Sequence, residues 1–182
     1  MEFARSHGFP VPRVHDAGDG YIVMDRLHGT SLLEWALPFR ISAAGRLLGR
    51  LHNQLHELDA PADLERHAPI EGDRLLHGDL HALNVMVTDD GPMVIDWANA
   101  MVGDPCFDVA DCWVVTACAD TPPGVPAMVA SFVRRILLRS FLRTADPGRA
   151  SSAMTAAAAA ARSRDPNITD SERHRLAGFG RP

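Results

Sequence analysis

The chain has 182 residues, a formal net charge of −5 at neutral pH and hydrophobic residues at 46% of positions. This length and composition predict a globular protein with one core of ordinary size. Its apolar runs are well short of the roughly 20 residues that cross a bilayer. Its polar start, MEFARSHGFP, is unlike a signal peptide. We therefore expect a cytoplasmic protein without membrane contact.

Charge is distributed unevenly along the sequence. Residues 1–130 contain eight Arg against nineteen Asp or Glu, whereas residues 131–182 contain ten Arg against four acidic residues. Because the Arg-rich part has no basic run and no interleaved aromatic residues, we expect a solvated helical surface there and no nucleic-acid partner. The three cysteines lack metal-ligand spacing, so reduced thiols packed in the core are expected.

The predicted secondary structure begins with two short strands within residues 10–27, around the turn DAGDG. A helix is predicted over residues 42–61, where leucines recur at three- and four-residue spacing. Ser42 is its predicted N-cap and Pro61 its predicted stop. Further helices are predicted over residues 105–119, 123–143 and 150–162.

Two β-prone runs, NVMVT and PMVID, flank the turn DDG at residues 89–91 and predict a hairpin. A register with paired residue numbers summing to about 180 places Asn84 opposite Asp96. Carboxylate and amide oxygens are ligands that Mg²⁺ prefers. Asp79 precedes Asn84 by five residues, in the loop that enters the first strand. An Asp that accepts a hydroxyl proton, with Asn and Asp holding Mg²⁺ on phosphates, is the machinery of phosphoryl transfer.

Simpler roles are expected for other polar residues of this region. We expect His77 to hydrogen-bond to backbone near the loop, whereas His81 is open between a phosphate or metal contact and an exposed position. Asp104 before Pro105 predicts a helix N-cap. Asp108 is expected to brace the same helix or the backbone of the loop.

The segment HGDLHALN followed by IDW resembles the catalytic loop and metal-binding segment of the aminoglycoside phosphotransferase and choline kinase family, which has the protein-kinase-like fold. GFPVPRV, YIVMDRLHGTSL, LLGRLHNQLH and GDPCFDVAD resemble further segments of that family in the same order. The resemblance implies an α+β fold. Residues 1–27 would be a remnant of the small lobe with the hinge, and residues 28–182 the mostly helical large lobe.

The same resemblance implies a function and a set of site residues. Asp79 would be the catalytic base, and Asn84 and Asp96 the Mg²⁺ ligands. The implied reaction moves the γ-phosphoryl group of ATP to a hydroxyl of a small molecule, such as an aminoglycoside, choline or a sugar. The adenine of ATP would meet the segment formed by Met24, Asp25, Arg26 and Leu27.

The sequence departs from this family in the parts that hold the nucleotide phosphates. Kinases of this fold carry a Gly-rich loop and a lysine on early strands, yet the 182 residues include no lysine and no Gly-rich loop before residue 10. Arginine is not an equivalent replacement for lysine. The alternative prediction is therefore a catalytically inactive kinase-like binding module or a gene fragment.

The acceptor and a second enzyme class follow from weaker signals. The acidic residues 1–130 favour a cationic acceptor, and Asp111 and Asp120 belong either to an acidic wall or to a hydrated surface. GDLH also resembles dimetal phosphoesterases, but the Asp-x-His and Asn-His ligands that they need do not occur in the sequence. Metal-dependent hydrolysis is therefore not expected. The sequence does not predict an oligomeric state.

Overall fold

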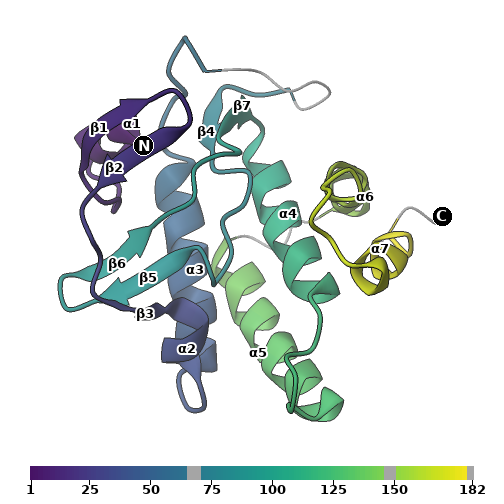
Figure 1. Ribbon diagram of the computed structural model, residues 1–182. Helices are drawn as coiled ribbons and strands as arrows, with labels where there is room; N and C mark the ends of the chain where they lie inside the picture. The colour runs from purple at the N-terminus through teal and green to yellow at the C-terminus, as the bar shows by residue number, and fades with distance from the viewer. Residues whose placement is uncertain (65–70, 146–150, 180–182) are drawn as a thin grey trace.

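The N-terminal part of the protein is a β-hairpin beside a short helix. The computed structural model describes residues 1–64, 71–145 and 151–179 (Figure 1). Helix α1 (Glu2–Ser6) is followed by the antiparallel strands β1 (Val14–Gly18) and β2 (Tyr21–Met24). These strands confirm the hairpin predicted around DAGDG. All four residues of β2 are exposed.

Two further small antiparallel sheets lie between this hairpin and the helices. One contains β3 (Gly29–Ser31), β5 (Val85–Thr88) and β6 (Gly91–Val94) in the order β3-β5-β6, and the other pairs β4 (Arg74–Leu76) with β7 (Met101–Gly103). The loop between β4 and β5 carries the HGDLHALN segment.

The register predicted for the β5–β6 hairpin is wrong by one residue. Thr88 pairs with Gly91, so the turn consists of Asp89 and Asp90 alone and Gly91 already belongs to the strand. Ile95 consequently lies opposite Asn84, and its backbone N–H donates to the Asn84 carbonyl oxygen at 3.0 Å. Asp96 lies one residue beyond the paired strand, where the predicted opposition fails.

The other regular elements of the described chain are helices (Figure 1). They are α2 (Leu32–Ala36), α3 (Ile41–Leu55), α4 (Pro105–Cys118), α5 (Ala127–Ala145), α6 (Ser152–Arg162) and α7 (Asp170–Leu176). The three predicted C-terminal helices are confirmed with small shifts of their ends. Residue 150, the predicted start of the last one, lies outside the described residues. The mixture of helices and small sheets confirms the predicted α+β class.

Both predicted ends of the leucine-rich helix are wrong. Arg40 precedes α3, and the Ser42 hydroxyl lies 2.9 Å from the Ser140 hydroxyl of α5 instead of capping its own helix. The helix ends at Leu55, six residues before Pro61. After it the backbone pairs with the β4 segment, since Leu75 N–H donates to the Leu58 carbonyl at 3.0 Å. This tertiary pairing overrides the helical spacing of the leucines.

Helices α3 and α5 approach closely because α3 has glycines at the contact. A Cβ atom at Gly45 would lie 2.4 Å from the Leu137 carbonyl oxygen, and one at Gly49 would lie 2.9 Å from that of Phe141. Both distances are below normal contact, so only glycine allows this helix pair its spacing. The main hydrophobic core forms around α3 and α5 and extends to β5 and β6.

A second hydrophobic core attaches the C-terminal helices to α4. Its buried residues are Leu76, Phe107, Ala110, Val114, Cys118, Ala158, Ala159 and Leu176. Two small alanines let α6 lie close against α4, so the C-terminal end of α6 has a fixed place next to the HGDLHALN loop. Among the residues that the structure describes, no helix combines the length and apolar character that a membrane crossing needs.

Candidate active site

The loop that carries Asp79 begins with a glycine that the fold requires. Gly78 has φ +73°, a conformation that other residues rarely adopt. A Cβ atom on Gly78 would also lie 2.3 Å from the Asn99 carbonyl oxygen. The HGD sequence therefore gives the loop a tight turn that brings Asp79 next to the segment following β6.

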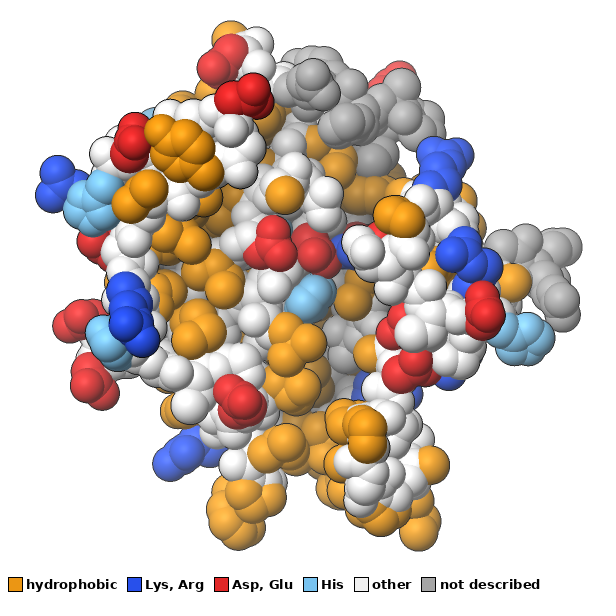
Figure 2. Space-filling view, in the orientation of Figure 1, with side chains coloured by type: hydrophobic (Ala, Val, Ile, Leu, Met, Phe, Trp, Pro, Cys, Tyr) orange, Lys and Arg blue, Asp and Glu red, His pale blue; other side chains and the backbone are white. Residues whose placement is uncertain are grey.

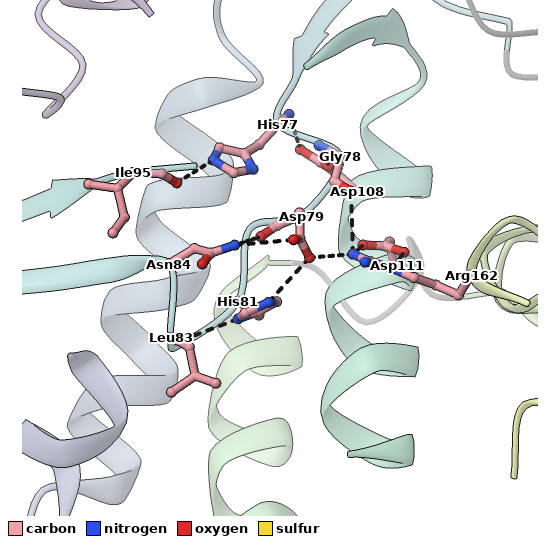
Figure 3. Close-up of polar contacts among 10 residues, drawn as sticks. All are labelled: His77, Gly78, Asp79, His81, Leu83, Asn84, Ile95, Asp108, Asp111 and Arg162. Carbon is pink, nitrogen blue, oxygen red and sulfur yellow. Dashed lines mark hydrogen bonds and ion pairs between the residues drawn. The ribbon is translucent and has the colours of Figure 1, made fainter. Parts of the chain in front are cut away.

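Asp108, from the first turn of α4, holds the backbone of this loop (Figure 3). Its carboxylate accepts hydrogen bonds from the N–H of His77 at 2.9 Å and of Gly78 at 2.8 Å. Its third contact is His56 Nε2 at 3.2 Å. Burial acts to raise the pKa of Asp108, but the hydrogen bond and charge of His56 and the neighbouring histidines outweigh burial and leave this pKa well below its ordinary value. The expected bracing role of Asp108 is confirmed.

Asp104 likewise has its expected structural role. It lies at the N-cap of α4, followed by Pro105, and its carboxylate accepts a hydrogen bond from the Cys106 N–H at 2.8 Å. This cap fixes the start of the helix that carries Asp108.

His77 links the loop to the segment after β6. Its Nε2 atom lies 3.0 Å from the Ile95 carbonyl oxygen, and its ring centroid lies 4.7 Å from that of Trp97. Burial lowers the pKa of His77, with Asp108 acting in the opposite direction. A buried ring with a backbone partner acts structurally, as the sequence suggested.

Asp79 is the centre of a polar cluster (Figure 3). The Asn84 side-chain NH₂ donates to the Asp79 carbonyl oxygen at 2.9 Å and to its Oδ2 at 3.2 Å. His81 Nε2 lies 3.2 Å from Asp79 Oδ1, and the Arg162 guanidinium donates to the same oxygen. Burial acts to raise the pKa of Asp79, but His81 and Arg162 outweigh it, so this pKa lies below its ordinary value. The carboxylate is thus ionised at neutral pH.

Asp111 is the second carboxylate that contacts Arg162. Its side chain is 3% exposed, so the hydrated surface position, one of the two expectations for this residue, is wrong. Arg162 Nε and Nη2 donate to its two carboxylate oxygens at 2.8 and 2.7 Å. Burial raises the pKa of Asp111 to about 6, although the contacts with Arg162 act in the opposite direction. Asp120, in contrast, is exposed and pairs with Arg175.

Asp96 lies at a backbone position that is unusual for a residue other than glycine. Its φ is +63°, and it is the one non-glycine residue with a positive φ in the described part of the chain. Such a conformation is tolerated by Asp and is often found at functional sites. Asp96 is exposed and lines the same cleft as Asp79. The two carboxylates therefore line one cleft, whereas the predicted opposition of Asn84 and Asp96 is wrong.

The cleft has a volume of about 980 Å³ and opens between the HGDLHALN loop, the segment after β6 and helix α6. In the space-filling view, acidic side chains lie together at the middle of this face (Figure 2). Its charged lining residues are Asp79, Asp96, Asp111, Arg162, Arg164 and Asp165. The cleft thus offers oxygen ligands and hydrogen-bond donors next to an apolar wall of alanines from α6.

A second, smaller groove of about 460 Å³ adjoins the predicted hinge. The four residues predicted to contact adenine line this groove: Met24, Asp25, Arg26 and Leu27. Its other lining residues are Ile22, Val23, Met86 and Ile95. The Asp25 carboxylate is engaged within the protein, because it lies 2.6 Å from His15 Nε2 and 3.2 Å from the Arg13 backbone nitrogen. Ile95 lines this groove and Asp96 lines the larger cleft, so the two hollows are one residue apart.

The residues present fit a magnesium ion. Both hydrogen bonds of the Asn84 side chain use its nitrogen, so its amide oxygen remains for a cation. Within residues 1–64, 71–145 and 151–179, no side chain pairs with the Asp96 carboxylate. No group of three or more His, Cys, Asp or Glu residues in that part of the chain forms a metal site. Two protein ligands suit Mg²⁺ that takes its other ligands from phosphates and water.

Sequence reasoning missed Arg162 as a site residue. The sequence suggested a solvated surface for the Arg-rich part, which holds for the exposed Arg135, Arg139 and Arg143. Arg162 instead reaches a carboxylate 83 positions earlier in the chain. Its only local signal is a single charge at the end of an alanine-rich helix. His81 is not in the exposed position that was one of its two expectations, since it is half-buried and contacts Asp79, and its contact with a phosphate or metal stays a prediction.

Comparisons with known proteins show which families the sequence resembles. The sequence model of the phosphotransferase enzyme family matches residues 60–151, and that of the RIO domain matches residues 1–105. A probable bifunctional tRNA threonylcarbamoyladenosine biosynthesis protein of Methanoculleus marisnigri is 32% identical over 97 residues. These residues are 53% of this chain, and the chain covers only 15% of the length of that relative.

Solved structures share the fold over nearly the whole chain. A thermostable mutant of aminoglycoside phosphotransferase APH(4)-Ia, in ternary complex with AMP-PNP and hygromycin B, matches with a TM-score of 0.67 and 16% identity, over 98% of this chain and 80% of that chain. An ethanolamine kinase of Plasmodium vivax matches with a TM-score of 0.62 and 9% identity, over 99% of this chain and 70% of that one. The division of this chain at residue 27 stays a prediction. The chain belongs to the phosphotransferase enzyme family and has its kinase-like fold.

Proposed function

We propose that this protein transfers the γ-phosphoryl group of ATP to a hydroxyl group of a small molecule. One observation carries the proposal: Asp79 and Asp96 line one cleft next to the hinge groove, and the buried Asn84 amide is hydrogen-bonded to Asp79. A nucleotide whose base lies in the groove would direct its phosphates past Ile95 toward Asp96. The aminoglycoside phosphotransferase of the same fold was solved with AMP-PNP, which supports ATP as the donor.

Each residue has a distinct role in this reaction. Asp79 orients the acceptor hydroxyl and accepts its proton as the oxygen attacks the γ-phosphorus, and the bond from this phosphorus to the β,γ-bridging oxygen breaks to release ADP. Asn84 orients Asp79 through its NH₂ group and offers its oxygen, with the Asp96 carboxylate, to Mg²⁺. When bound, Mg²⁺ neutralises charge on the nucleotide phosphates. Catalysis then depends on positioning and electrostatics, as in other phosphoryl transfers.

A cationic acceptor is supported by the charge of the cleft. Its lining contains four Asp residues against two Arg residues. Asp79 and Asp111 share Arg162, and Asp96 is assigned to Mg²⁺, so Asp165 is the lining carboxylate that remains to attract a cationic acceptor. An aminoglycoside and ethanolamine appear in the names of the proteins that share this fold, which is consistent with such an acceptor. The tRNA-related name of the sequence relative makes a macromolecular acceptor the competing choice.

The second candidate function is a kinase-like binding module that does not turn over ATP. It is favoured by the absence of lysine from all 182 residues, because kinases of this fold hold the α- and β-phosphates with that side chain. The contacts that hold Asp79, His77 and Asn84 favour the enzyme instead, since a binding module has no need of an oriented carboxylate.

The test is a phosphoryl-transfer assay with Mg²⁺-ATP and a panel of aminoglycosides, choline, ethanolamine and sugars. Wild type is expected to phosphorylate a member of the panel, and Asp79→Asn to lose roughly 10²–10⁴-fold in rate without a change in fold. Asp90→Asn, in the exposed hairpin turn, is the matched control and keeps the wild-type rate. Unchanged turnover in Asp79→Asn would remove the assignment of the base. Absence of both transfer and nucleotide binding would favour the binding module.

A further inference from the structure

Arg162 is the site residue that the proposed reaction does not yet use. It is the last residue of α6, and its side chain is only 14% exposed. Its guanidinium contacts Asp79 and Asp111, and Nη2 also lies 3.4 Å from the Gly78 carbonyl oxygen (Figure 3). An arginine with this many partners in a cleft has one available orientation.

Asp111 determines that orientation. The two contacts at 2.8 and 2.7 Å form the paired geometry in which a planar guanidinium fits a carboxylate. Asp111 is buried on α4, and the second hydrophobic core packs α4 against α6. The Arg162 guanidinium is therefore held by the packing of α4 against α6 and by its pair with Asp111. This makes it a rigid hydrogen-bond donor to Asp79.

The contacts on the Asp79 carboxylate leave a defined place for an acceptor. Oδ1 receives Arg162 and His81, and Oδ2 receives Asn84. A carboxylate offers about four lone-pair directions, two on each oxygen. The direction that remains is on Oδ2, next to Asn84, which is the proposed magnesium ligand. Arg162 and His81 thus hold the far oxygen while the near oxygen stays available.

From this geometry we infer that Arg162 is a positioning residue: anchored by Asp111, it orients the Asp79 carboxylate so that Oδ2 faces the acceptor hydroxyl. The role rests on the proposed phosphoryl transfer, because Arg162 acts only through Asp79. It makes helix α6 part of the catalytic apparatus. The opposite possibility is that the contact restrains Asp79 and lowers its activity, and the two differ in the sign of the effect on turnover.

The kinetic test compares Arg162→Gln and Arg162→Lys with the control Arg135→Gln, which removes an exposed charge from α5 outside both hollows. For Arg162→Gln we expect kcat to fall roughly 10–100-fold, the range of a misplaced catalytic group, with the KM for Mg²⁺-ATP nearly unchanged. Arg162→Lys should be intermediate, since it keeps the charge and loses the fork. An unchanged or increased kcat in Arg162→Gln would overturn the inference, and so would a change confined to KM.

A second measurement tests the contact between Arg162 and Asp79 without an activity assay. Urea unfolding midpoints are compared for wild type, Arg162→Gln, Asp79→Asn and the double variant, and a matched cycle pairs Arg135→Gln with Asp79→Asn. Substitutions of two residues in contact are not additive in their effect on stability. The double variant of Arg162 and Asp79 should therefore lose clearly less stability than the sum of the losses in the two single variants. The Arg135 cycle should be additive. Additivity at Arg162 would overturn the inference even in an active enzyme. Coupling without any phosphoryl transfer would instead locate the failure in the proposed function.

Discussion

The contact between Asp108 and the catalytic loop can be tested by replacing its carboxylate with an amide of the same size. Asp108 is 1% exposed and accepts from two backbone N–H groups and from His56. In Asp108→Asn, one carboxylate oxygen becomes an NH₂ group that faces a donor, either the His77 or the Gly78 backbone. One buried N–H then loses its acceptor, and the remaining hydrogen bond loses its charge.

The expected cost follows from those two changes. An unsatisfied buried donor costs about 1–3 kcal/mol, and a hydrogen bond to a charged group exceeds a neutral one by about 1 kcal/mol. Together they predict a loss of about 2–4 kcal/mol in the free energy of unfolding. For a chain of this length that corresponds to a Tm lower by roughly 5–15 °C. The lost contacts hold the loop. Relative to wild type, hydrogen exchange in Asp108→Asn should therefore accelerate more at the amides of the loop than at those of α5.

Thermal and urea unfolding followed by circular dichroism measure this loss. The matched control is Asp104→Asn in the same helix, because Asn and Asp are equally good N-caps and the Cys106 N–H keeps an acceptor. A loss below about 0.5 kcal/mol in Asp108→Asn, similar to an ordinary surface substitution, would refute the reasoning.

Three further predictions concern pH, helix packing and the nucleotide groove. The folded-state pKa of Asp108 lies below its unfolded value, so the stability that Asp108 contributes is complete above about pH 4 and is lost as pH falls further. In urea unfolding from pH 7 to pH 3, the difference in unfolding free energy between wild type and Asp108→Asn should therefore shrink. Gly45→Val should destabilise the protein by at least about 1–3 kcal/mol, since a Cβ would meet the Leu137 carbonyl at 2.4 Å. Met86→Asp should weaken Mg²⁺-ATP binding, measured by calorimetry, by at least about tenfold, because it places a charge in the hinge groove where the apolar face of the adenine base would lie.

Each of these predictions has a control in the same molecule. Arg50→Ala on the exposed face of α3 should leave the unfolding free energy nearly unchanged. If Gly45→Val changed the unfolding free energy as little as Arg50→Ala, this would argue against the close contact between α3 and α5. Val129→Asp, at an exposed position near the start of α5, should bind nucleotide as wild type does, and unchanged binding in Met86→Asp would exclude that groove. A stability difference at Asp108 that stays constant to pH 3 would contradict its lowered pKa.

The local parts of the site could be predicted from the sequence, because short-range spacing determines them. Asp79 and Asn84 are five residues apart in one loop and are hydrogen-bonded. The turn residues Asp89 and Asp90 identified the hairpin that leads to Asp96. The register was wrong by one residue because the glycine that follows them belongs to the strand and not to the turn. The backbone at Asp96, with its positive φ, nevertheless directs this residue to the cleft.

The parts of the site that depend on helix packing could not be predicted. Arg162 meets residues 83 and 51 positions earlier, and nothing near it in the sequence marks a buried ion pair. Asp111 looked like a surface residue because carboxylates are rarely buried without a partner, and its partner comes from a helix that arrives much later in the chain. The end of α3 was missed for the same reason, since the β4 segment that pairs with Leu58 lies beyond it.

The most direct test of the central claim is a calorimetric titration of wild type and Asp96→Asn with the ATP analogue AMP-PNP, each with and without Mg²⁺. If Asp96 and Asn84 hold the metal on the nucleotide phosphates, wild type binds the analogue at least about tenfold more tightly with Mg²⁺, and Asp96→Asn loses most of this difference. Nucleotide affinity that is equal with and without Mg²⁺ in wild type, or a magnesium dependence that Asp96→Asn retains in full, would contradict the account.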